Sequence, residues 1–223
     1  MSFLSEIRPL AGQGPQRAPV IAALDAGTYY HHRTFRTPAL AACLDAIVYV
    51  RDLDAAALAS CDIFIVSCAS PVDQLVRVRR LFHDFLQQGK TLVVMGGNGA
   101  EQWLDGVQYV HSPVNFWWWK EPGADSGLRL AAPEHELFRH ITLADATWHQ
   151  HGAYLPPPGA VSLIDKAGVG SVLYDDCRST PGRLILSSLD PMYHHGSHFM
   201  PATTRFLHGF LPWLKRQSLP MRE

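Results

Sequence analysis

The sequence of 223 residues predicts an α/β protein with three αβα layers and a mostly parallel central sheet. Strand-like and helix-like segments alternate from residue 19 to residue 104, which is typical of parallel strands joined by right-handed crossovers. The segments 62–67 and 91–95 are continuous apolar runs, as expected for strands covered on both faces. A glycine turn at 96–99 follows the second run, at the edge where open α/β sheets bind ligands.

In chain order, the first strand is expected at 19–25 and a polar, aromatic loop at 27–33. Thr37 then starts a helix as its N-cap, with Pro38 in the first turn, and this helix extends to residue 44. Gly89 is expected to close the helix 72–88, because glycine accepts the left-handed conformation found at helix ends. The other predicted elements are strands at 46–50, 161–165, 170–174 and 183–189, helices at 54–60, 100–104 and 202–215, and a histidine-rich loop at 190–201.

Residues 19–215 are expected to form a single domain between a loose N-terminal leader, 1–18, and a C-terminal tail, 216–223. No composition shift or internal repeat marks a second domain. Residues 105–160 have the least regular pattern. Pro212 lies inside the pattern of the last helix and is expected to kink it or end it.

Composition and charge exclude several kinds of partner. The net charge is −1 and the pI is about 6.9, so there is no broad basic field and no nucleic-acid partner is expected. The first residues contain no long apolar run, so neither a signal peptide nor a membrane partner is expected. The four cysteines form no Cys-x-x-Cys pair, and reduced thiols in a cytoplasmic protein are the simplest interpretation.

The stretch from Gly89-Lys90 through the apolar strand to the glycine turn resembles the nucleophile elbow of class I glutamine amidotransferases. In that family the turn carries the cysteine nucleophile, whose position falls here on Gly96, Gly97 or Asn98. The resemblance implies a flavodoxin-like fold. It does not imply glutaminase chemistry, because none of these three residues can attack a carbonyl carbon.

Later segments are similar to the trehalose-utilisation-like branch of the same superfamily. The residues that carry this similarity are the pattern His135-x-Leu137-x-Arg139-x-Ile141, the stretch 147–154 and the run 182–190. The chain departs from the branch where His151-Gly152 replaces a frequent Asp-Glu pair, and where Asp190 replaces a glycine. The resemblance covers about residues 19–215 and implies a carbohydrate-related ligand.

Histidine is abundant, with 12 residues, and several lie where loops should converge above the carboxyl edge of the sheet. Histidine suits proton transfer near neutral pH. The predicted catalytic residues are His149, His194, His195 and Asp190, with Asp190 as the carboxylate partner of a histidine. The predicted ligand-binding residues are Tyr30, His31, His32, Cys68, Ser70, Gly96, Gly97, Asn98, Trp118, His151, Tyr193 and His198.

Several of these residues also have a purely structural interpretation. Cys68 can be a packing thiol at a strand end, and the glycine turn can be a tight turn without a ligand. His149 and His151 lie two residues apart and can chelate a metal from one face of a strand. The spacing matches no known metal signature, so no metal or other cofactor is assigned.

Three functions remain open from the sequence. The first is binding or transformation of a small molecule in a pocket lined by histidine and tryptophan. The second is a catalytically inactive assembly subunit, in which the 117–119 tryptophan run contacts another subunit of a homo-oligomer. The third is a metal-dependent hydrolase.

Overall fold

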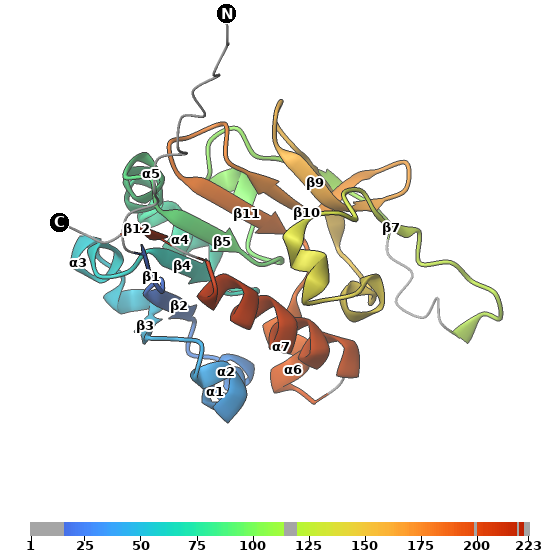
Figure 1. Cartoon of the computed structure of the whole chain (residues 1–223), viewed down its shortest axis with the longest axis horizontal. Helices are drawn as coiled ribbons and strands as arrows, with labels where there is room; N and C mark the ends of the chain where they lie inside the picture. Colours follow the sequence, from blue (N-terminus) through green and yellow to red (C-terminus); the bar gives the residue numbers. More distant parts are fainter. Residues whose placement is uncertain (1–15, 114–119, 199, 218, 221–223) are drawn as a thin grey trace, which may run out of the picture.

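The computed structural model describes residues 16–113, 120–198, 200–217 and 219–220 (Figure 1). Within these residues, ten strands form one mixed sheet, and two short strands near the termini pair with each other. The strand order along the sheet is β3-β2-β4-β5-β11-β10-β8-β6, with β9 paired to β10 and β7 paired to β9. The strands are β1 Gln16–Arg17, β2 Ile21–Asp25, β3 Ala46–Tyr49, β4 Ile63–Val66, β5 Thr91–Val94, β6 Gln108–His111, β7 Leu128–Leu130, β8 Gly152–Leu155, β9 Val161–Lys166, β10 Gly170–Asp176, β11 Arg183–Ser187 and β12 Leu219–Pro220.

The sheet has a parallel part and an antiparallel part. The strands β3, β2, β4, β5 and β11 are all parallel neighbours, as expected from their alternation with helices and their apolar sequences. From β10 outward every pairing is antiparallel, including those of β8, β6, β9 and β7. The sequence did not predict this antiparallel extension, because part of it comes from the irregular segment 105–160.

The helices are short except for the last one. Their bounds are α1 Tyr29–Arg36, α2 Pro38–Ala41, α3 Ala55–Ala59, α4 Val72–Arg77, α5 Arg79–Gln87, α6 Pro191–Gly196 and α7 Pro201–Lys215. Single 3-10 turns are η1 Val50–Asp52, η2 Ala100–Gln102, η4 Glu136–Arg139 and η5 Leu143–Ala146. No described helix combines the length and the apolar character needed to cross a bilayer.

Two segments that were predicted as loops are helices. The first is α1, where the side chain of Thr28 accepts a hydrogen bond from the backbone N–H of His31 and caps the helix. The second is α6, which starts with Pro191 in its first turn, directly after Asp190. The polar and aromatic composition of these two segments does not predict a helix. Each helix is stabilised by packing rather than by strong helix propensity.

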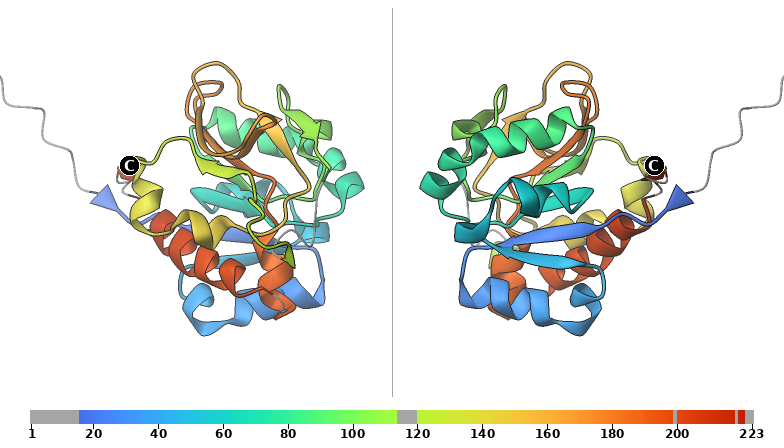
Figure 2. Two further views of the ribbon diagram at one scale, coloured as in Figure 1. Left: turned by 90° about the vertical axis from the view of Figure 1, so that its right-hand side faces the viewer. Right: turned by 90° about the vertical axis from the view of Figure 1, so that its left-hand side faces the viewer.

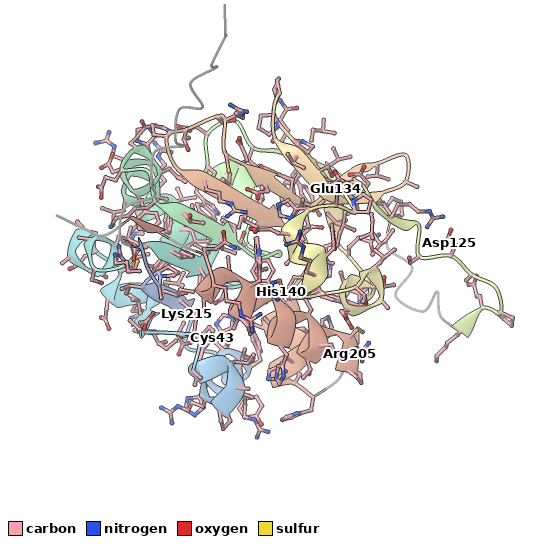
Figure 3. All side chains as sticks on the ribbon, viewed as in Figure 1. Cys43, Asp125, Glu134, His140, Arg205 and Lys215 are labelled. Atoms are coloured by element: carbon pink, nitrogen blue, oxygen red, sulfur yellow. The ribbon has the colours of Figure 1, made fainter. Side chains whose placement is uncertain are left out.

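Other predicted boundaries are also corrected. The predicted helix 72–88 is two helices, α4 and α5, separated at Val78. The helix that starts at Pro38 ends at Ala41 instead of residue 44. Thr37 is its N-cap residue, as predicted, but the Thr37 hydroxyl donates to the Arg33 carbonyl and makes no capping hydrogen bond. Pro212 does not end α7, which continues to Lys215. The Lys215 ammonium, near the C-terminal end of α7 in Figure 3, pairs with Asp45.

Both faces of the parallel strands are packed. Ile21 and Ala23 of β2 belong to the core that contains α1, α2, α6 and α7, whereas Ala22 and Leu24 belong to the core that contains α3, α4 and α5. Figures 1 and 2 show the two sets of helices on opposite sides of the sheet. This double covering explains why the strands are continuously apolar, and it leaves the carboxyl edge of the strands open to polar residues.

Candidate functional site

Loops from four parallel strands meet at the carboxyl edge of the sheet, as predicted. The ring Nε2 of His31, after β2, lies 2.8 Å from the Cys68 carbonyl oxygen, after β4. The backbone N–H of Tyr193, on α6, donates to the Cys68 sulfur at 3.4 Å. After β5, the N–H of Gly96 donates to the Leu189 carbonyl oxygen at 2.8 Å, beyond β11.

The glycine turn after β5 is held by close packing. A Cβ atom on Gly96 would lie 2.2 Å from the Ser188 carbonyl oxygen, so only glycine fits there. Gly97 has a φ of +76°, which also favours glycine. The Asn98 side chain is buried and donates to the Met95 carbonyl oxygen at 2.5 Å. The turn therefore brings the end of β5 against the end of β11.

The centre of the site is the carboxylate of Asp190. Its Oδ1 accepts a hydrogen bond from the indole N–H of Trp148 at 3.0 Å. Its Oδ2 lies 3.3 Å from Nε2 of His194 and 3.5 Å from Nε2 of His151. Nε2 of His149 lies 3.1 Å from Nε2 of His194. We call His149, His151, His194 and Asp190 the histidine–aspartate cluster.

Helix geometry explains how α6 contributes to this cluster. Asp190 and His194 are four residues apart, so their side chains lie on the same face of the helix. His149 and His151 come from the segment just before β8, and their rings are in edge contact at 5.2 Å between centroids. Pairing of β8 with β10 and β6 brings this segment to the end of β11.

The environment sets the ionisation of the cluster. Burial alone would raise the pKa of Asp190, but hydrogen bonds from His151 and His194 lower it overall. The hydrogen bond to Asp190 raises the pKa of the His151 ring. Burial lowers the pKa of His149 to about 4, so its ring is neutral at neutral pH. The cluster therefore combines a carboxylate with at least one neutral imidazole.

A small cavity borders the cluster at His151. Its volume is about 180 Å³, and its lining is Gly97, Gly99, Glu101, Tyr109, His151, Tyr154 and Ser188. The side chain of His151 is 42% exposed, whereas that of His194 is 1% exposed. His151 is thus the cluster member that a small molecule in this cavity would meet.

Other predicted residues lie away from the cluster. The two ring nitrogens of His195 face Thr37 and Thr204, at 3.1 Å and 2.9 Å. His32 is exposed on α1. His198 pairs with Arg33 at the surface. These three histidines therefore have contacts away from the Asp190 carboxylate.

His31, Cys68 and Ser70 have structural partners. His31 is fully buried, and its Nδ1 accepts a hydrogen bond from the N–H of Ala26 at 3.1 Å. The Cys68 thiol is fully buried, and burial raises its pKa strongly. The hydroxyl of Ser70 donates to the Ser67 carbonyl oxygen at 2.8 Å. These contacts hold the loops that carry the site.

Tyr30 and Tyr193 lie beside the cluster rather than in it. Their rings are in edge contact at 5.0 Å between centroids, which confirms the expected proximity of the segments after β2 and β11. The Tyr193 ring also contacts the His194 ring at 4.9 Å. Trp118 lies outside the described residues.

Several site residues were missed by sequence reasoning. Trp148 orients Asp190, and Glu101, Tyr109 and Tyr154 line the cavity. The sequence offered one indication that Trp148 belongs to the site, namely its position directly before His149. Glu101, Tyr109 and Tyr154 come from segments whose pairing the sequence pattern does not specify.

A larger cavity, about 420 Å³, lies elsewhere in the molecule. It is lined by residues from α5, the segment 103–107 and the β10–β11 connection, including Arg79, His83 and Trp103. It shares no lining residue with the smaller cavity. Its mixed charges, from arginine and aspartate, do not indicate a particular ligand.

Comparison with known proteins supports the fold and not the activity. No protein-family model matches the sequence, and the comparison with curated proteins gives no match. Cytoplasmic protein STM3548 from Salmonella typhimurium is similar in structure, with a TM-score of 0.54 and 12% identity over 89% of this chain and 100% of that chain. A candidate GMP synthase component from Thermoplasma acidophilum has a TM-score of 0.53 and 14% identity over 88% of this chain and 96% of that chain.

The N-terminal domain of mmIFT52 is also similar, with a TM-score of 0.54 and 10% identity over 91% of this chain and 100% of that domain. These identities are too low to transfer an activity. The likeness to the GMP synthase component agrees with the resemblance found in the sequence. The chain thus has a mixed α/β fold similar to the folds of these three proteins.

Proposed function

We propose that this chain is an enzyme that transforms a small polar molecule with the histidine–aspartate cluster as its reacting centre. The observation that carries the proposal is the convergence of two imidazoles, those of His151 and His194, on one buried carboxylate beside a cavity, with the His149 ring against His194. Buried polar groups are costly unless they are paired, and active sites are where such groups are concentrated.

We assign the chemistry to the histidine–aspartate cluster because no cysteine is placed to act as a nucleophile. Gly96, Gly97 and Asn98 supply no nucleophile at the elbow, and the Cys68 thiol is buried without access to the cavity lining. Imidazole groups can move protons to and from a bound molecule. The accessible ring of His151 is the group we assign to contact the substrate, with Asp190 as its positioning residue.

The ligand class follows from the cavity and from the sequence resemblance. Tyr109, Tyr154, Glu101 and Ser188 provide hydroxyl and carboxylate groups together with aromatic surface, which suits a hydroxylated molecule. The resemblance to the trehalose-utilisation-like branch favours a carbohydrate-related compound. The proposal has three further parts. The chain has a three-layer flavodoxin-like arrangement, belongs to that branch and is located in the cytoplasm.

Binding can be tested with a panel of monosaccharides, disaccharides and sugar acids, observed through the histidine ring signals in NMR. We expect a panel member to shift the His151 signals, and His151→Gln to weaken its binding by about tenfold or more through loss of the imidazole hydrogen-bonding group. The matched control is His83→Gln, since His83 lines the larger cavity. Binding that survives His151→Gln and is lost in His83→Gln would place the ligand in the larger cavity and contradict the proposal.

The panel also tests for chemistry. We expect mass spectrometry to detect conversion of the bound compound by the unaltered protein and none by His151→Gln. Absence of binding by every panel member, together with a stable homo-oligomer lost on Trp118→Ala, would instead support the alternative of a catalytically inactive module that serves in assembly.

A further inference from the structure

Three ligand-type side chains of the cluster converge closely enough to share one ion. One ring nitrogen each from His149 and His151 and one carboxylate oxygen of Asp190 all lie within 4.8 Å of one another. Nε2 of His151 and Oδ2 of Asp190 are 3.5 Å apart. Ligands about 2.1 Å from a tetrahedral zinc ion are about 3.4 Å apart, so this separation already has the required length.

From this arrangement we infer that His149, His151 and Asp190 form a divalent metal site that takes Zn²⁺. Two imidazoles and one carboxylate are a donor set that suits zinc and other first-row metals. Three protein ligands leave a coordination position for water or substrate, which is the arrangement of catalytic zinc sites. The inference deepens the proposed function, on which it rests, by naming the cofactor through which His151 would meet the substrate.

The surroundings orient two of the three ligands, Asp190 and His149. The indole N–H of Trp148 holds Oδ1 of Asp190, which leaves Oδ2 directed toward the histidines. His194 lies 3.3 Å from that oxygen and 3.1 Å from Nε2 of His149, so it contacts both ligands. Such outer partners orient the ligands of metal sites.

The cavity gives the ion a path to the site and lies on the side where its open coordination position is expected. His151 is the ligand that lines the cavity of about 180 Å³, whereas Asp190 and His149 are buried. An ion held here would therefore face the cavity, where a bound water molecule could act on a substrate. Zinc lowers the pKa of such a water and makes hydroxide available near neutral pH.

The test uses the full chain without an affinity tag, stripped with a chelator and titrated with Co²⁺ and with Zn²⁺. We expect about one equivalent of Zn²⁺ per chain to remain after desalting, measured by elemental analysis, and intense visible absorption from Co²⁺ in a site of low coordination number. His151→Gln should weaken binding by more than about tenfold, and His149→Gln should do the same. Because His151 is half-exposed, its variant should stay folded even where His149→Gln does not.

The matched control is His195→Gln, which alters a partly buried histidine of α6 outside the cluster and should bind like the unaltered protein. Binding that is equally strong in His151→Gln, or lost equally in His195→Gln, would overturn the inference. Absence of bound Co²⁺ and Zn²⁺ would also overturn it. A carbohydrate that still binds through His151 in that case would leave the proposed function standing, so the two failures are distinguishable.

Discussion

At the scale of single residues, the fold places histidines and cysteines in different surroundings that the sequence pattern does not distinguish. His194 and His195 are neighbours in the chain, yet only His194 faces Asp190. Of the four cysteines, Cys43, Cys61 and Cys68 are buried and Cys177 is exposed. Burial raises the pKa of the Cys68 thiol, which removes it further from nucleophilic chemistry.

We predict that only Cys177 reacts quickly with a thiol reagent in the native protein, because the other three thiols are buried and do not meet the reagent. Labelling with Ellman's reagent should give a fast phase that Cys177→Ser removes, and all four thiols should react in denaturant. Rapid labelling of Cys68 in the folded protein, located by peptide mass spectrometry, would contradict this picture.

The same reasoning extends to glutamine. The protein should release no ammonia from glutamine, since the elbow has no thiol and Cys68 is buried. An ammonia release that is abolished by Cys68→Ser but not by Asn98→Ala would instead make Cys68 a nucleophile.

At the scale of elements, the strands β10 and β11 are tied to the last helix by one ion pair. Asp175 of β10 accepts hydrogen bonds from the Arg183 guanidinium, at 2.9 Å from Nε to Oδ1. Nη1 of Arg183 donates to Gln217 at 3.1 Å, just beyond α7, and the guanidinium lies over the Trp213 ring at 5.2 Å. His135 lies 3.4 Å from the Asp175 carboxylate. The pair therefore connects the antiparallel and parallel parts of the sheet with α7.

This ion pair should make stability depend on pH in the acid range. Burial alone would raise the pKa of Asp175, but hydrogen bonds from His135 and Arg183 lower it to about 2, from an ordinary value of 3.8. Since the folded pKa is below the unfolded pKa, the stabilisation is complete above about pH 4 and is lost as the pH falls toward 2. The contribution at stake is about 2 kcal/mol in the free energy of unfolding.

Urea unfolding at several pH values measures this contribution. The difference in unfolding free energy between the unaltered protein and Asp175→Asn should shrink by about 2 kcal/mol between pH 5 and pH 2. Asp125→Asn is the control, because the Asp125–Arg129 pair is exposed and screened by solvent. A difference that stays constant with pH for Asp175→Asn would show that the pair does not determine acid stability.

At the scale of the whole molecule, the two hydrophobic cores share the same strands. Neighbouring residues of β4 illustrate this, since Ile63 and Ile65 enter one core and Phe64 enters the other. One core contains Phe210 of α7, and the other contains Phe82 of α5. Unfolding of the shared strands would therefore expose both cores to solvent.

We predict that both cores unfold together. Phe82→Ala and Phe210→Ala should each lower the free energy of unfolding by about 3–5 kcal/mol, because each removes a fully buried aromatic ring. In either variant, hydrogen-exchange mass spectrometry should show faster exchange in peptides from both α5 and α7. Faster exchange confined to the helix that carries the substitution would contradict cooperative unfolding.

The sequence by itself determined the parallel strands and the absence of a cysteine from the glycine turn 96–99. Runs such as Ile63–Val66 and Thr91–Val94 are β-branched and continuously apolar, and that pattern has one simple outcome, a strand buried on both faces. The glycine turn at Gly96 was also readable, because a turn at a strand end requires residues without a Cβ atom.

Tertiary structure alone decided which side chains form the site. Asp190 selects His194 and not His195 because α6 is a helix, in which residues four apart share a face and adjacent residues do not. His149 and His151 reach Asp190 only because β8 pairs with β6 and β10, a long-range choice that no local pattern encodes. Local propensity fixes elements, whereas the convergence of distant side chains depends on the free energy of packing the whole sheet.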